Sequence, residues 1–121
     1  MRDIRIAAVQ FEARDADKEY NLGRIAALAA RAVGEGAEAV AFHECCATGY
    51  TFLQELPAAR IAELAEPVPE GPTTRRLIEL AGRLNAAILA GLVEIDGDKL
   101  FNCYVAVTPA GFVAKHRKIH A

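Results

Sequence analysis

The apolar residues of the chain recur in blocks that alternate between the period of a strand and the period of a helix. Residues 4–10 are almost all apolar and predict a strand buried on both faces. Over residues 20–33 the apolar positions are three or four apart, which predicts a helix that ends at Gly34 and Gly36. Residues 37–42 predict a second buried strand. Strand, helix and strand in succession indicate an α/β layer architecture.

The middle of the chain is rich in proline and leads into a second helix. Four prolines frame a short segment at residues 58–65 that mixes apolar and polar positions. Thr73 or Thr74 can cap the helix that follows. Its expected inner face consists of five apolar side chains: Leu77, Ile78, Leu80, Ala81 and Leu84.

Three further strands are expected at residues 87–95, 100–107 and 112–118. The pair Asp96-Gly97 predicts a tight hairpin between the first two, and Pro109 fits the second position of the next turn. Five strands with only two substantial helices leave one face of a sheet thinly covered. This balance is typical of the first half of a larger domain.

Composition and charge exclude several classes of protein. With 121 residues, 53% hydrophobic and 25% charged, the chain suits one globular domain. A net charge of -2 gives no reason to expect a nucleic-acid or membrane-surface partner, and no apolar run is long enough to span a bilayer. Three cysteines, two of them adjacent, suggest no disulfide framework, so a cytoplasmic location is expected.

The stretch HECCATGY, residues 43–50, contains the first candidate chemistry. Glu44 follows a predicted buried strand, where partial desolvation would raise its pKa towards the range of a general base. The alternative is a glutamate at a strand end that faces water. Thr48-Gly49 suggests a tight backbone turn after it.

The cysteines are weak candidates for a nucleophile. A reactive thiol needs a nearby cation or a helix N-terminus, whereas the neighbouring carboxylate of Glu44 raises a thiol pKa. Cys45, Cys46 and Cys103 are therefore expected to be buried packing residues, and a redox pair of Cys45 and Cys46 is disfavoured by geometry. A metal site would draw on residues that lack common zinc spacing, so neither a metal nor a cofactor is expected. The residues considered for it are His43, Cys45, Cys46, His116 and His120.

The basic segment KHRKIHA, residues 115–121, is the second candidate. On a strand, His116 and Lys118 would point to one face, and Lys115 and Arg117 to the other. One interpretation is a solvated basic edge that prevents aggregation. Another is that Lys118 faces a developing negative charge. A polyanion-binding patch is a third, disfavoured by the acidic balance of the chain.

Taken together, these segments resemble the nitrilase superfamily of carbon–nitrogen hydrolases over all 121 residues. They occur in the order IRIAAVQFEA, a helix with Asn21, GAEAVAFHECCATGY, GPTTRRLIELAGRLNAAILAGLVE, LFNCYVAV and GFVAKHRKIH. The resemblance implies an α-β-β-α sandwich and a Glu-Lys-Cys triad. Glu44 matches the general base and Lys118 the triad lysine. The family's nucleophilic cysteine lies beyond that lysine, so the sequence stops before it. Ala121 departs from the leucine usual in the family.

The resemblance implies that residues 1–121 are the N-terminal part of a single hydrolase domain, truncated before the nucleophile segment. The implied reaction is hydrolysis of a small amide, carbamoyl compound or nitrile, with no cofactor, by a homodimer or higher homo-oligomer. This chain alone is expected to be inactive. The alternative is a non-catalytic truncated chain or an oligomerising domain of the same fold.

Overall fold

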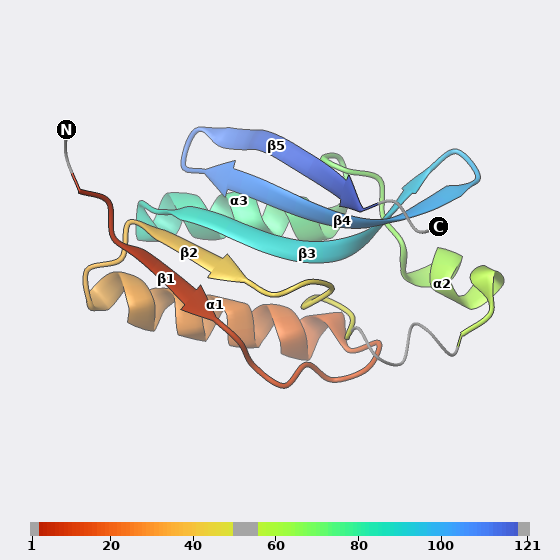
Figure 1. The fold of residues 1–121 in the computed structure, drawn as a ribbon, viewed down its shortest axis with the longest axis horizontal. Helices are drawn as coiled ribbons and strands as arrows, with labels where there is room; N and C mark the ends of the chain where they lie inside the picture. Colours follow the sequence, from red (N-terminus) through yellow and green to blue (C-terminus); the bar gives the residue numbers. More distant parts are fainter. Residues whose placement is uncertain (1–2, 50–55, 119–121) are drawn as a thin grey trace.

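A computed structural model of the chain describes residues 3–49 and 56–118 (Figure 1). In these ranges, five strands form one sheet, in the same order in space as in the sequence. The elements in chain order are β1 (Ile6–Val9), α1 (Lys18–Gly34), β2 (Ala39–Phe42), α2 (Ala58–Leu64), α3 (Pro72–Leu84), β3 (Ala87–Asp96), β4 (Lys99–Thr108) and β5 (Gly111–Lys118). The α/β architecture expected from the sequence is confirmed.

The sheet is mixed because its connections differ in length. β1, β2 and β3 are parallel, since helical crossovers join them, and β3, β4 and β5 are antiparallel, since short turns join them. The hairpin predicted at Asp96-Gly97 is present, with Asp96 paired to Lys99 and a positive φ of 63° at Gly97. The following turn is also confirmed by the pairing of Thr108 with Gly111.

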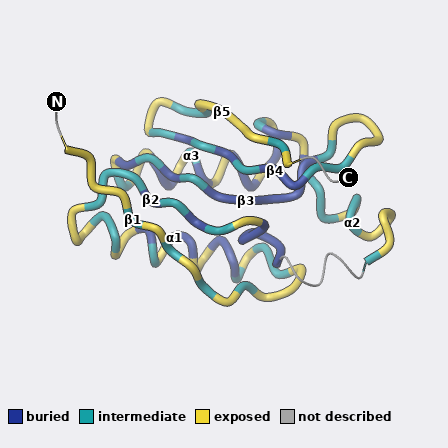
Figure 2. The backbone as a smooth tube through the Cα atoms, viewed as in Figure 1, coloured by how far each residue is buried: buried dark blue, intermediate teal, exposed yellow. Residues whose placement is uncertain are grey.

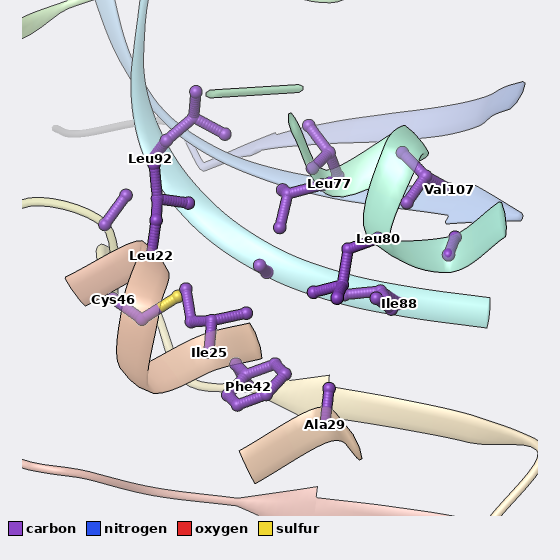
Figure 3. Packing of buried hydrophobic residues seen from close by; sticks show 14 of the residues in the cluster. Leu22, Ile25, Ala29, Phe42, Cys46, Leu77, Leu80, Ile88, Leu92 and Val107 are labelled. Carbon is purple, nitrogen blue, oxygen red and sulfur yellow. The ribbon is translucent and has the colours of Figure 1, made fainter. Parts of the chain in front are cut away.

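The hydrophobic core lies between the sheet and the two long helices. Side chains from α1, α3 and the facing side of the strands form one continuous cluster (Figure 3). Ile25 of α1, Leu77 of α3 and Ile88 of β3 are almost fully buried within it. Burial of side chains this large contributes about 1.5–3 kcal/mol each, so this cluster is the main source of stability in the described residues.

The opposite face of the sheet is largely uncovered by the described residues. The two N-terminal strands were predicted to be buried on both faces, and this is wrong for the described chain (Figure 2). β1 and β2 instead alternate between more and less buried side chains, and Ile6 is exposed. The reason is that both long helices pack on one face only. The expectation that one face of the sheet would be thinly covered by helices is therefore confirmed for the described residues.

The start of α3 differs from the sequence prediction. Neither Thr73 nor Thr74 is the N-cap; Gly71 occupies that position and Pro72 begins the helix. The buried carboxylate of Glu66 accepts from the Thr73 amide at 2.7 Å and from the Thr73 hydroxyl. A side chain from outside the helix therefore satisfies its free amide, which local sequence could not reveal.

Candidate active site

Glu44 lies in a short turn that directly follows β2. The turn passes through Cys45, whose φ of 50° is a left-handed conformation that few non-glycine residues adopt. The Gly49 amide donates to the Cys45 carbonyl at 2.8 Å, and the φ of Gly49 is 90°. The tight turn expected at Thr48-Gly49 is thus confirmed, while Tyr50 lies outside the described residues.

Gly91 of the neighbouring strand β3 is in backbone contact with this turn. The Ala47 amide donates to the Gly91 carbonyl at 3.2 Å, and the Cys46 thiol donates to the same oxygen at 3.6 Å. A Cβ at position 91 would lie 2.9 Å from the Cα of Glu44 and closer still to the amide nitrogen of Cys45. Only glycine permits this approach, so β3 helps to fix the position of Glu44.

Asn21 holds the same turn from the side of α1. Its fully buried side-chain amide donates to the carbonyls of Ala47 and Arg14, each at 2.9 Å. Its oxygen accepts from the Arg14 amide at 2.8 Å. All the polar atoms of this side chain are therefore used in tethering two loops, which is a structural role.

Lys118, at the end of β5, points towards Glu44. Its Nζ donates to Glu44 Oε1 at 3.4 Å, although the two residues are far apart in the sequence. The two side chains are 51% and 47% exposed, so the carboxylate is partly desolvated and also reaches solvent. Lys115 and Arg117 point to the other face, as the strand alternation predicted, and both bind Glu94 there.

Glu44 and Lys118 share a pocket of about 650 Å³. Its walls come from the end of β2, from β4 and from β5, and they combine charged, polar and aromatic groups. The lining residues are Phe42, His43, Glu44, Asn102, Tyr104, His116 and Lys118. A carboxylate beside an ammonium group in such a hollow can accept a proton and stabilise a developing negative charge on a bound substrate.

Hydrogen bonding and burial affect the protonation of two aromatic residues in the wall of this pocket. The Tyr104 hydroxyl donates to the Phe42 carbonyl at the end of β2, and burial raises the pKa of the Tyr104 phenol. Burial also lowers the pKa of His43, whose ring packs edge-on against Phe11. Both shifts favour neutral side chains, so the charges facing Glu44 from these two positions are small near pH 7.

The three cysteines are buried free thiols, as the sequence predicted. Burial, and then the charge of Glu44, raises the pKa of Cys45 to about 11. Burial raises the pKa values of Cys46 and Cys103 to about 12 each. Cys46 lies among the core side chains of Figure 3. Since a thiolate is the nucleophilic form, none of the three is suited to attack a substrate near pH 7.

The thiols of the 121-residue chain are therefore expected to resist alkylation by iodoacetamide at pH 8. With a pKa of about 11, Cys45 is thiolate in only about one molecule in a thousand at that pH. Mass spectrometry should find little modification of the folded chain and three additions in denaturant. Rapid labelling of Cys45 in the folded chain would contradict its assignment as a packing residue.

No three histidine, cysteine, aspartate or glutamate side chains gather into a potential metal site within residues 3–49 and 56–118. His120, one of the five residues considered for a metal, lies outside these ranges, as does Ala121. Among the described helices, none has the length and apolar character needed to cross a membrane.

A family model for carbon-nitrogen hydrolases matches residues 5–121. The chain belongs to this family. It is 36% identical over 117 residues to a nitrilase of Pyrococcus abyssi, an alignment that covers 97% of this chain and 44% of that protein. It is 34% identical over 122 residues to an omega-amidase of Danio rerio, covering 99% of this chain and 41% of that protein.

A solved structure gives the same result for the fold. The nitrilase-superfamily member Nit3 of Saccharomyces cerevisiae matches with a TM-score of 0.80 and 28% identity, over 97% of this chain and 44% of that one. The chain therefore spans less than half the length of these relatives. Its α and β layers correspond to part of the fold expected from the resemblance.

The sequence prediction missed three contributors to the candidate site. Asn102 and Tyr104 line the pocket from β4, and Gly91 admits the Glu44 turn. A weak signal was present, because Asn102 interrupts an apolar strand and shares a face with Tyr104. The role of Gly91 depends on how closely two backbone segments approach each other. A single sequence does not reveal that distance.

Proposed function

We propose that residues 1–121 are the N-terminal part of a single domain that hydrolyses non-peptide carbon–nitrogen bonds, with Glu44 as general base and Lys118 as triad lysine. The observation that carries this proposal is the 3.4 Å approach of Lys118 Nζ to Glu44 Oε1 inside one pocket. The family membership of the chain supports it. The nucleophilic thiol comes from a residue outside this sequence.

In the proposed reaction, Glu44 accepts the thiol proton as the sulfur forms a bond to the carbon of the amide or nitrile. Lys118 stabilises the negative charge that develops on the substrate. For an amide, Glu44 returns the proton to the leaving nitrogen as the carbon–nitrogen bond breaks, which leaves a thioester. For a nitrile, the first product is a thioimidate, and addition of one water to it releases ammonia and gives a thioester. Water, deprotonated by Glu44, then attacks the thioester, and the acid and the thiol are released.

We propose small amides, carbamoyl compounds and nitriles as the substrate class. The names of the relatives, a nitrilase and an omega-amidase, support the nitriles and the amides in this class.

The test is to express the full-length protein from its complete reading frame and measure its intact mass and its activity. Release of ammonia or amine from a panel of these substrates is the expected result, with a cysteine outside the present sequence labelled by a slow substrate. The isolated 121-residue chain is the control and should be inactive. A full-length protein of about this length that hydrolyses nothing in the panel would overturn the proposal.

An oligomerising or non-catalytic domain is the second candidate, and the uncovered sheet face favours it. Ile6 of β1 points away from the core and is an exposed large apolar side chain. Homodimers or higher homo-oligomers would remove such surface from water. Sedimentation velocity distinguishes the cases: this candidate requires stable association of the isolated chain together with no hydrolysis by the full-length protein.

A further inference from the structure

Asn102 of β4 lies between the two residues assigned to the proposed reaction. In the sheet it is directly opposite Lys118 of β5, and its side chain reaches Glu44 beyond the end of β2. Its Nδ2 donates to Glu44 Oε2 at 3.3 Å. The residue is only 9% exposed, and it stands in an otherwise apolar strand interior. A buried amide in this setting requires polar partners, because an unsatisfied amide is costly.

The two oxygens of Glu44 are held by different donors. Asn102 donates to Oε2, and Lys118 donates to Oε1 at 3.4 Å. A quarter-turn of the carboxylate plane about its terminal bond would break both contacts. The pair of donors therefore favours one orientation, in which Oε1 faces Lys118 and the pocket.

The orientation of the Asn102 amide is itself set by Cys45. The Cys45 thiol donates to Asn102 Oδ1 at 3.5 Å, which turns Nδ2 towards Glu44. The raised pKa of Cys45 keeps this thiol protonated and able to donate. Cys45, which the sequence predicted to be a packing residue, thus also has a contact that orients the site.

We propose that Asn102 is a positioning residue that orients Glu44 for proton transfer. Cys45 orients the amide of Asn102, and this amide in turn orients the carboxylate of Glu44. The inference rests on the proposed function, in which Glu44 is the general base. A neutral amide suits this task, because it binds one oxygen of Glu44 without adding a second charged group beside Lys118. An aspartate would place a second carboxylate beside Glu44 and disfavour its ionised form.

Replacing Asn102 separates a positioning role from a merely structural one. In the full-length protein, N102A should lower kcat by about 10- to 100-fold with little change in KM, because a misdirected base impairs chemistry rather than binding. N102D should move the acid limb of the pH–kcat/KM profile up by about one pH unit. N85D is the matched control, since it makes the same charge change at the exposed cap of α3 and should keep the wild-type profile.

Other titratable groups near Glu44 must be separated from this effect. Lys118 and His116 face it from β5, Tyr104 from β4, and His43 from the adjoining turn. The profile is therefore measured in H116Q as well, where the N102D shift should persist. An N102D profile identical to wild type, or a shift that disappears in H116Q, would overturn the proposal.

A titration that does not depend on enzyme activity distinguishes this inference from the proposed function. In the 121-residue chain, the protonation of Glu44 is followed by carbon-13 NMR of its carboxyl group, assigned with E44Q. The midpoint should rise in N102D and stay at the wild-type value in N85D. If these midpoints are observed but the full-length protein is inactive, the contact between Asn102 and Glu44 is supported and the proposed hydrolase function is rejected. An unchanged midpoint in both N102D and N102A overturns the role of Asn102, even if the enzyme is active.

Discussion

Glu44→Gln in the full-length protein is expected to lower kcat by about 10²- to 10⁴-fold, the usual contribution of general acid–base catalysis. Glutamine keeps the size of the side chain and one of its two acceptor oxygens, but it cannot take up the thiol proton. Lys118→Ala should cost about 10²- to 10³-fold, because the developing charge loses its ammonium partner. Initial rates of ammonia release with a small amide or nitrile measure both effects.

The two variants should remain folded, which makes the loss of activity interpretable. The side chains of Glu44 and Lys118 are about half exposed, and ion pairs of this kind contribute little to stability. Glu70→Gln and Lys99→Ala make the same chemical changes at exposed positions and should retain wild-type rates. Rates near wild type in Glu44→Gln or Lys118→Ala, with the protein folded, would remove the residue from the proposed mechanism.

The two effects should not add, because both residues act on the same reaction step. The double variant should therefore be only slightly slower than the worse of the single variants. If the losses multiply fully, Glu44 and Lys118 act independently, and the 3.4 Å contact between them has no part in the chemistry.

The elements that the sequence predicted well are those determined by local interactions. The hairpin at Asp96-Gly97 depends on a glycine that takes a φ of 63°, and α1 ends at Gly34, just before Gly36 takes a φ of 104°. The inner face of α3 follows from the spacing of its apolar residues. Each of these signals lies within one turn or one helix, so no knowledge of the rest of the fold is needed.

The errors concern contacts between distant segments. An all-apolar strand such as β1 predicts burial on both faces, but only the fold decides how many layers cover it in the described chain. The cap of α3 is supplied by Glu66 of the preceding loop, not by a threonine of the helix. Strand pairing and loop position determine both features, and neither is encoded in the local pattern.

The candidate site was predicted in part for the same reason. Alternation along β5 correctly placed Lys118 and His116 on one face, with Lys115 and Arg117 on the other. The partner that those last two residues meet was not foreseen. It is Glu94 of β3, which reaches across β4 to both residues of β5.

Glu94→Gln is expected to reduce the free energy of unfolding by about 3 kcal/mol, the usual cost of removing one partner from a buried ion pair. Glu94 is 1% exposed and accepts from Arg117 Nε at 2.7 Å, from Arg117 Nη2 at 2.9 Å and from Lys115 Nζ. Glutamine offers one acceptor oxygen in place of two and turns an N–H₂ group towards the cations. Urea unfolding followed by circular dichroism measures the loss.

Asp96→Asn is the matched control, because Asp96 binds the same guanidinium from the surface. Its Oδ2 accepts from Arg117 Nη2 at 2.9 Å, but its side chain is 64% exposed. An exposed partner is screened by water, so the variant should unfold at nearly the same urea concentration as wild type. Equal losses in the two variants would mean that burial of Glu94 is not what makes its ion pairs important.

The pH dependence of stability gives an independent test of the Glu94 ion pairs. Burial alone would raise the pKa of Glu94, but hydrogen bonds from Arg117 and Lys115 outweigh it and hold the pKa below the ordinary 4.5. The contribution of ionised Glu94 to the free energy of unfolding is therefore fully present above about pH 4.5. It is lost as the pH falls through the folded-state pKa, because the unfolded chain takes up the proton first. Glu94→Gln has no carboxyl group to titrate, so its unfolding free energy should decline less steeply than that of wild type over this range. The two curves should approach each other in acid, whereas a constant separation between them would show that the lost stability comes from packing and not from charge.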